Sequence, residues 1–239
     1  MSPSSRCIVL GVSLIVSIAQ AAAPPSLEEP ALVHPVLLHA GDAWQLFARC
    51  PTRKVLPGEP LIESTDLVRR PGIALAAARN ESEQVSLVIR PAAELSGVSV
   101  SFGPLEGPQS ISEAAWSWQR VVNVPVDKAT SWYGTGGWQT GRIPDPLAPG
   151  EPFSAPAGEN TTLLLTVRTP VDAAPGVYRG TIRVEAPGTA QAAIPVELTV
   201  WDIALPATRT MDTMACGVGV DDPELCRFLA DSGVTSLKY

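Results

Sequence analysis

Proline and glycine are spread through nearly the whole chain, and they constrain the fold more than any other feature. The 239 residues include 24 prolines and 19 glycines. This density interrupts helices, but it suits many short strands joined by turns. Between these breakers, residues 98–102 and 194–200 alternate apolar and polar side chains, as half-buried strands do. The sequence therefore predicts a mainly β fold, built as an antiparallel β-sandwich.

The second half of this β region has the clearest strand and turn signals. Residues 162–168 place Leu163, Leu165 and Val167 on one face of an expected strand. Pro175-Gly176 fits a type II turn, because proline sets the first φ and glycine accepts the positive φ that follows. A strand over residues 178–184 follows the turn. Regular turns between alternating strands support the sandwich over residues 43–206.

The first residues predict an export signal. Arg6 precedes an apolar stretch over residues 8–18, which is too short to span a bilayer comfortably. Ala19-Gln20-Ala21 fits the small-x-small cleavage rule, and cleavage after Ala23 is an alternative. We therefore expect a signal peptide over residues 1–21 and a flexible lead-in over residues 22–42. The exported chain would be secreted or periplasmic, without a stable membrane anchor after cleavage; an uncleaved anchor is the alternative.

Charge and residue types exclude several classes of function. The net charge of −7 and a pI near 4.9, without basic clusters, argue against nucleic acid and anionic membranes as partners. With only His34 and His39 in the chain, a histidine metal site is not expected. Motifs for nucleotide binding, zinc proteolysis or serine hydrolysis are absent, so we expect no cofactor, no metal and no catalytic residue here.

The cysteines leave the disulfide question open. Cys7 would be removed with the signal peptide, which leaves Cys50, Cys216 and Cys226, an odd number. Export permits disulfides, but no pair has the CxxC or zinc-finger spacing. The sequence does not decide whether two of these residues are bonded, or whether Cys216 and Cys226 are simply small buried apolar side chains.

A different pattern begins at residue 207. Residues 211–217 predict a strand, 222–232 a helix and 234–239 a second strand. Asp222 is a good N-cap, Pro223 suits the first helical position and Gly233 suits the end of the helix. An apolar helix face carries Leu225, Phe228 and Leu229. Such a β-α-β unit cannot bury both faces alone, so residues 207–239 are interpreted as the start of an incomplete (β/α)8 barrel.

Four segments carry a resemblance to a known family. They occur in order and are ARNESEQ (78–84), IPDPL (143–147), AGEN (157–160) and TPVDAAPGVYRG (169–180), followed by a matching run over residues 194–206. Together they resemble the N-terminal β-sandwich of glycoside hydrolase family 123 proteins and their DUF4091 relatives. The resemblance covers residues 73–239.

The resemblance implies a sandwich that precedes a catalytic barrel. Relatives with known activity are similar to β-N-acetylgalactosaminidases, in which the substrate's acetamido group attacks, an Asp orients it and a neighbouring Glu is the general acid. That Asp-Glu pair lies well inside the barrel, which needs about 250 residues. We therefore expect a non-catalytic module that supports the missing barrel and shapes one wall of its substrate cleft. The alternative is a stand-alone carbohydrate-binding or cell-surface sandwich.

A tryptophan-rich stretch supplies the candidate glycan contacts. Residues 125–157 have no period and many breakers, and are interpreted as one long ordered loop. Within it, Trp132, Tyr133 and Trp138 offer aromatic planes for sugar rings, and Asp145 offers an acceptor for hydroxyl protons. Glu159 is a further acceptor. Trp116 and Trp118 share a strand face and are expected in the core instead.

The motif around Asn80 carries two nearby carboxylates. Glu81 and Glu83 would point the same way in a strand, and paired carboxylates serve as acid and base in glycosidases. Turn or capping hydrogen bonds are the favoured interpretation, because no pocket signal surrounds them. Asn80 and Asn160 also match the N-glycosylation sequon, which is a weak signal.

Overall fold

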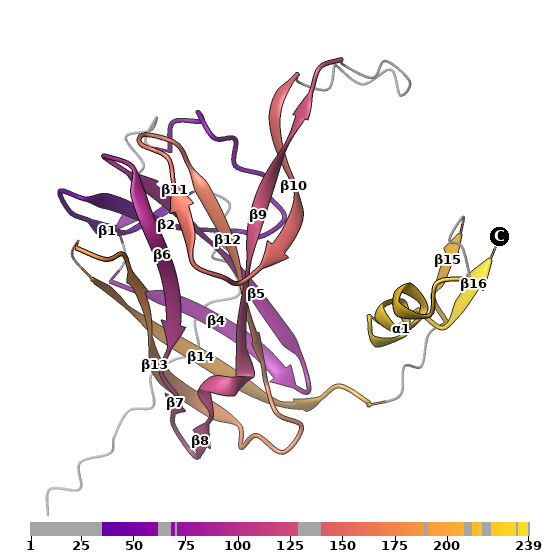
Figure 1. Cartoon of the computed structure of the whole chain (residues 1–239). Helices are drawn as coiled ribbons and strands as arrows, with labels where there is room; N and C mark the ends of the chain where they lie inside the picture. The colour runs from indigo at the N-terminus through magenta and orange to yellow at the C-terminus, as the bar shows by residue number, and fades with distance from the viewer. Residues whose placement is uncertain are drawn as a thin grey trace, which may run out of the picture. The chain divides into compact units, whose positions relative to one another are not determined.

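The computed structural model describes residues 35–61, 68–69, 71–128, 140–188, 191–207, 212–216, 221–232 and 234–238. The expected signal peptide lies outside these residues, as does the aromatic triplet Trp132, Tyr133 and Trp138. Most of the described chain is strand, with one α-helix near the C-terminus (Figure 1). The prediction of a mainly β fold is confirmed.

Two large sheets account for the sandwich within the described residues (Figure 1). The first has the order β10 (Gly141–Pro149), β9 (Trp116–Val126), β12 (Thr161–Arg168), β5 (Ser82–Pro91), β2 (Trp44–Arg49), β1 (Val36–Ala40) and β3 (Val68–Arg69). The second has the order β11 (Phe153–Ala155), β6 (Leu95–Phe102), β13 (Gly176–Glu185), β14 (Ala192–Ala204) and β4 (Ile73–Arg79), with the short β7 (Leu105–Glu106) and β8 (Ser110–Ile111) beside β13. A 3₁₀ turn, Glu113–Ala115, precedes β9.

Strand pairing in the sandwich is mainly antiparallel, as expected. β12 pairs with β5 and β9, and β13 pairs with β14 and β6, all antiparallel. Two pairs differ: β4 runs parallel to β14, and β3 runs parallel to β1. The β4–β14 pair aligns Ile73 with Val196, so segments far apart in sequence close one edge of the second sheet.

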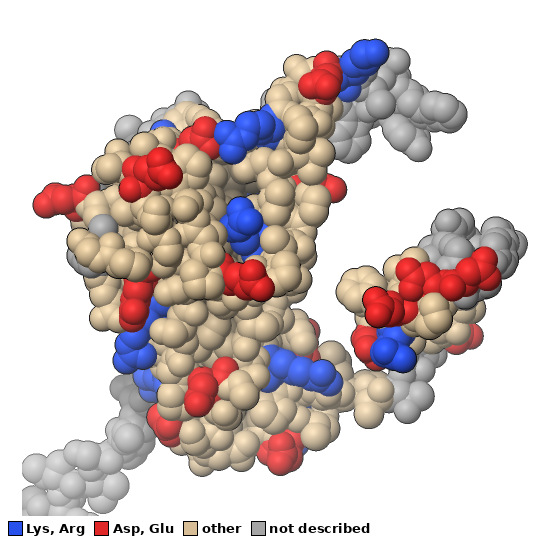
Figure 2. Space-filling view, in the orientation of Figure 1, with Lys and Arg blue, Asp and Glu red and all other residues tan. Residues whose placement is uncertain are grey.

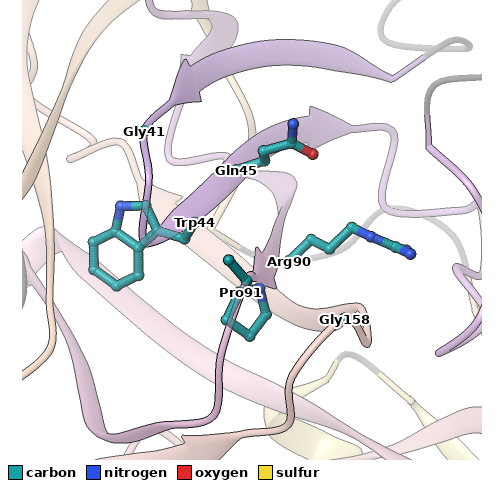
Figure 3. Close-up of a pocket in the computed structure, with 7 residues that line it drawn as sticks. Gly41, Trp44, Gln45, Arg90, Pro91 and Gly158 are labelled. Atoms are coloured by element: carbon teal, nitrogen blue, oxygen red, sulfur yellow. The ribbon is translucent and has the colours of Figure 1, made fainter.

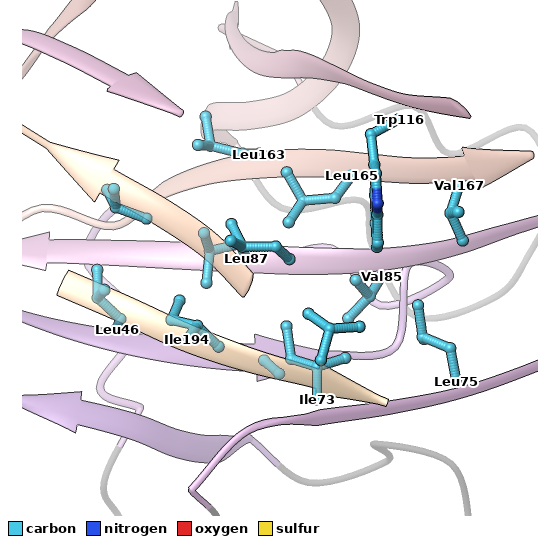
Figure 4. Close-up of a cluster of buried hydrophobic side chains, with 14 of the residues drawn as sticks. Leu46, Ile73, Leu75, Val85, Leu87, Trp116, Leu163, Leu165, Val167 and Ile194 are labelled. Carbon is cyan, nitrogen blue, oxygen red and sulfur yellow. The ribbon is translucent and has the colours of Figure 1, made fainter. Parts of the chain in front are cut away.

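The core lies between the two sheets. Leu46, Leu87 and Leu165 of the first sheet are fully buried. They form one apolar cluster with Ile73 and Ile194 of the second sheet (Figure 4). Leu165 of β12 and Ile194 of β14 lie where buried residues alternate with more exposed ones, so the period-two pattern in these sequences forms the inner face of each sheet.

The stretch expected to be a long loop contains three strands instead. β9 extends to Val126, β10 follows within the same stretch, and β11 covers Phe153–Ala155. The prolines that argued against a strand are tolerated because β10 is an edge strand of the first sheet. Its register also shifts between Pro144 and Leu147, where the ladder with β9 is irregular. The expectation of a loop over residues 125–157 was therefore wrong.

The sheet also begins earlier than the sequence indicated. Val36–Ala40, within the range expected to be a flexible lead-in, forms β1 and pairs with β2 on one side and β3 on the other. Val36 and Leu37 are buried there. Pairing on both sides satisfies the backbone of a segment whose own sequence carries only a short apolar signal.

In the motif around Asn80, Asn80 and Glu81 serve the turn between β4 and β5, whereas Glu83 lies within β5. Asn80 has a φ of 62°, a left-handed conformation that asparagine adopts more readily than most residues. The Ala78 N–H donates to Glu81 Oε2 at 2.6 Å, and Asn80 Nδ2 donates to the Leu205 carbonyl at 3.1 Å. The expected turn role is confirmed.

The C-terminal segment forms the expected β-α-β unit. β15 (Met214–Cys216) pairs in parallel with β16 (Ser236–Lys238), and α1 (Pro223–Asp231) connects them. Asp222 caps α1 by accepting from the Glu224 and Leu225 N–H groups. No helix in the described part of the chain is long and apolar enough to cross a membrane.

Candidate functional site

A buried polar network joins three separate segments at one end of the first sheet. Asn160, only 3% exposed, is its centre. Its Nδ2 donates to the carbonyls of Leu56 and Glu59 at 2.9 and 2.7 Å, and its Oδ1 accepts from Arg90 Nη1 at 3.2 Å. Its backbone N–H donates to the Pro57 carbonyl at 2.8 Å. The asparagine thus joins the loop after β2 to β5, and both ends of its side-chain amide form hydrogen bonds within the protein.

The Glu59 side chain also holds the loop after β2 in place. Its Oε1 accepts from Arg49 Nη1 at 2.9 Å, and its Oε2 accepts from the Leu56 N–H at 3.1 Å. Arg90 Nη1 also donates to the Glu59 carbonyl at 3.2 Å. The loop covers a second apolar cluster, in which Val55 packs with buried residues of β1, β2 and β5. Its shape is therefore set by both polar and apolar contacts.

Two acceptors that the sequence offered for sugar hydroxyls are already paired with cations. Asp145 on β10 lies 2.7 Å from Lys54 Nζ, and its side chain is 68% exposed. Both carboxylate oxygens of Glu159 lie 2.8 Å from Arg142 Nη1. Asp145 Oδ2 keeps acceptor capacity beside the Lys54 pair, so the role of Asp145 as a sugar contact stays a prediction.

The aromatic candidates divide into two groups. Trp132, Tyr133 and Trp138 lie outside the described residues, in the connection between β9 and β10, so their role as sugar contacts stays a prediction. Trp116 is buried and stacks on Phe102 with ring centroids 5.0 Å apart and planes 5° apart. Trp118 packs against the core beside Phe153, at a centroid distance of 6.1 Å. The expected core role of Trp116 and Trp118 is confirmed.

A small open pocket lies next to the buried polar network. It encloses about 240 Å³ and has mixed polar and apolar walls (Figure 3). Its lining residues are Gly41, Trp44, Gln45, Arg90, Pro91, Ala92 and Gly158. Gln45 of β2 and Arg90 of β5 are directly opposite partners across the sheet. Arg90 is the one charged residue in this lining.

Sequence reasoning did not single out the pocket residues. Gln45 and Arg90 are far apart in the chain, and only the β2–β5 register brings them together. The sequence feature that could have indicated the pocket is Arg90, which ends the largely apolar run over residues 85–89 just before Pro91. A charge at the end of an otherwise buried strand indicates either a partner or a site.

Among the described residues, the pKa is shifted at two side chains, Glu83 and Tyr178. Burial, and then the charge of Glu81, raise the pKa of Glu83 above its ordinary value. Among the described residues, no three His, Cys, Asp or Glu side chains are placed to hold a metal ion. Cys50 is a free thiol whose sulfur lies 3.1 Å from Thr52 Oγ1. Figure 2 shows acidic and basic side chains interspersed over the face in view.

Comparison with known proteins gives a structural likeness. No family model matches the sequence, and no curated protein matches it. The fold is similar to that of a family 123 glycoside hydrolase from Clostridium perfringens studied for glycolipid glycan hydrolysis, with a TM-score of 0.61 and 13% identity. The match covers 72% of this chain and 29% of that enzyme, so this chain spans less than a third of the enzyme's length. At this identity the likeness shows the fold.

Two further solved structures match with much lower similarity. One is a family 5 xyloglucanase from Bacteroides ovatus, with a TM-score of 0.28, 11% identity and coverage of 62% of this chain and 21% of that one. The other is the sporulation control protein Spo0M from Bacillus subtilis, with a TM-score of 0.30, 10% identity and coverage of 66% and 49%. Neither likeness is close enough to support an argument about fold or function.

Proposed function

We propose that this chain is the non-catalytic N-terminal sandwich module of an exported glycoside hydrolase related to family 123. In this role the sandwich supports a following (β/α)8 barrel and contributes to one wall of its substrate cleft. The barrel would carry the β-N-acetylgalactosaminidase-like chemistry, including the Asp-Glu pair, while this module binds no cofactor and no metal.

The fold likeness to the Clostridium perfringens enzyme is the observation that carries this proposal, because it covers most of this chain. The parallel β15–β16 pair with its connecting helix supports it, since such units are the repeating element of the barrel. Within the described residues, Glu81 serves a turn, and Asp145 and Glu159 form ion pairs, which is compatible with a supporting role.

The direct test is to read the gene beyond the codon for Tyr239 and to measure the intact mass of the exported product. A reading frame that continues into a barrel, with an Asp-Glu pair downstream, is the expected result. A stop codon after Tyr239 together with accumulation of the short product would overturn the proposal.

A turnover assay tests the non-catalytic assignment separately. Incubation of the purified chain with an aryl N-acetylgalactosaminide should release no aryl alcohol above a blank. Reproducible release that survives repeated purification would contradict the assignment, because the chain contains no candidate for the catalytic pair.

A stand-alone carbohydrate-binding module is the second candidate, favoured by the three aromatic residues between β9 and β10. Calorimetric titration with glycans separates the two. Saturable binding that disappears in Trp132→Ala and Trp138→Ala, but persists in Trp118→Phe, would favour the binding module. Absence of binding to a broad glycan panel would leave the supporting role as the better account.

A further inference from the structure

The pocket beside Asn160 presents hydrogen-bond donors without matching acceptors. Arg90 Nη1 is satisfied by the Glu59 carbonyl and by Asn160 Oδ1, but its other N–H groups have no partner among the described residues. The Gln45 amide likewise has no protein partner in the described part of the chain, and it stands opposite Arg90 across the β2–β5 ladder. We propose that this pocket binds a small carboxylate, with Arg90 and Gln45 as the donors that hold it.

Trp44, beside Gln45 on β2, closes the pocket on the core side of the sheet, on the opposite face from Gln45 and Arg90. Trp44 is 1% exposed, and its indole Nε1 is buried with no hydrogen-bond partner in the described structure. In Figure 3 this nitrogen lies on the side of the ring toward Gly41, which also lines the pocket. Because this nitrogen is buried in the core, a ligand in the open pocket does not reach it, and the proposal rests on Arg90 and Gln45.

The charge around the pocket favours an anion. The carboxylates of Glu59 and Glu159 are engaged elsewhere: Glu59 is paired with Arg49, and Glu159 is paired with Arg142. Arg90 is half-buried and forms no ion pair within the described residues, and the lining contains no acidic side chain. A partly desolvated guanidinium without a counter-charge is unfavourable, and the planar fork of arginine matches a carboxylate in two contacts.

The size of the pocket limits the ligand. At about 240 Å³ it is smaller than pockets that bind drug-sized molecules. A free organic acid or the acidic unit of a sugar acid both present the required carboxylate. This inference does not depend on the proposed supporting role, because the donors lie wholly within the sandwich.

Gly158 allows a closely matched test of the charge. Its φ is +68°, and a Cβ placed on it would meet no atom within 4 Å. Asparagine and aspartate tolerate this backbone region better than other residues. Gly158→Asp therefore adds a carboxylate at the pocket wall, and Gly158→Asn adds a side chain of equal size without charge. Gly188, with a φ of +75° and equally open space, provides Gly188→Asp as a control outside the lining.

The experiment is calorimetric titration of the purified chain with glucuronate, acetate and glucose at low ionic strength. We expect saturable binding of at least one carboxylate at one site, and none of glucose. Gly158→Asp should weaken that binding by about tenfold or more through like-charge repulsion. Gly158→Asn should weaken it less, and Gly188→Asp should leave it unchanged. Glucuronate binding without acetate binding identifies a sugar acid as the source.

Two results would overturn the proposal. One is the absence of saturable binding for both carboxylates, and the other is equal affinity of Gly158→Asp and the unchanged chain. Should Gly158→Asp lose its cooperative thermal unfolding, Gln45→Met serves instead, because it removes the amide while keeping the side-chain length. Unaltered carboxylate affinity in Gln45→Met would then count against the proposal.

Discussion

The sandwich and the C-terminal β-α-β unit follow local sequence rules equally well, yet they differ in how much apolar side-chain surface they bury. The sandwich encloses Leu87, Tyr178 and many other side chains completely. Helix α1 has a capped N-terminus and a proline at its first turn, but none of its residues is buried, and Phe228 is 64% exposed. Local signals are therefore enough to define an element, whereas burial supplies most of the free energy that holds it.

The sharpest test of this difference is to truncate one large apolar side chain in each region. Leu87→Ala should lower the free energy of unfolding by about 2–5 kcal/mol, because it removes buried surface and leaves a cavity. Phe228→Ala should change it by less than about 0.5 kcal/mol, because most of that ring already contacts water. Urea unfolding of both variants, followed by tryptophan fluorescence, provides the measurement.

A large loss of stability in Phe228→Ala would break the comparison, because it would mean that the helix face is buried in the folded chain. A small loss in Leu87→Ala would contradict the assignment of Leu87 to the core. Unchanged m-values in both variants would show that the same cooperative transition is being compared.

The next largest effect concerns the polar anchor of the sandwich. Asn160→Ala removes two donated hydrogen bonds and one accepted bond that join the loop after β2 to β5. We expect a loss of about 2–4 kcal/mol and faster proteolysis of the loop over residues 50–61. Gln84→Ala is the matched control, since it removes a single exposed side-chain bond to Thr166 and should cost less than about 0.5 kcal/mol. Equal stability of the two variants would refute the anchoring role of Asn160.

A smaller effect inside the sandwich depends on pH. Burial, and then the charge of Glu81, raise the pKa of Glu83 above its ordinary value of 4.5. The folded state therefore binds this proton more tightly than the unfolded chain, and the resulting stability is present at low pH and lost as the pH rises through the folded pKa. Glu83→Gln should be more stable than the unchanged chain at neutral pH and equally stable below pH 4.5.

Because Glu83 is partly exposed, solvent screening should keep this gain below about 1 kcal/mol. Melting temperatures measured from acid to neutral pH provide the test. Glu94→Gln, at an exposed position, removes the same charge and controls for net charge. A gain in Glu83→Gln that is constant across the pH range would show that ionisation is not its cause.

The alternating strands and the capped helix could be predicted because their signals are local. Leu163, Leu165 and Val167 share a face in the sequence pattern and are buried in the structure. β10 could not be predicted, because its prolines are tolerated only at a sheet edge, and edge position depends on the whole topology. The parallel pairing of β4 with β14 could not be predicted either, because neither segment's sequence indicates its distant partner.

The same limit applies to the candidate sites. Asp145 was predicted as an acceptor for sugar hydroxyls, which stays a prediction, and its pairing with Lys54 spans a sequence separation of 91 residues. Asn160 matched a sequon, whereas the structure uses its amide in a network with residues of two other segments. Arg90 and Gln45 could be recognised as neighbours only from the register of β2 and β5. Residue types indicate which chemistry is available, and long-range contacts decide which groups remain free.

The smallest expected effect on overall stability comes from the helix cap. Asp222→Ala removes the side chain that accepts from the Glu224 and Leu225 N–H groups, which lowers the local stability of α1 by about 1 kcal/mol. Because α1 has no buried residue, the main unfolding transition should not move. Hydrogen exchange should therefore speed up in residues 223–231 alone, and Asp222→Ser should restore protection, since serine also caps. A shift of the main transition in Asp222→Ala would mean that the helix and the sandwich unfold as one cooperative unit, and the difference between the two regions would then be one of exposure rather than of stability.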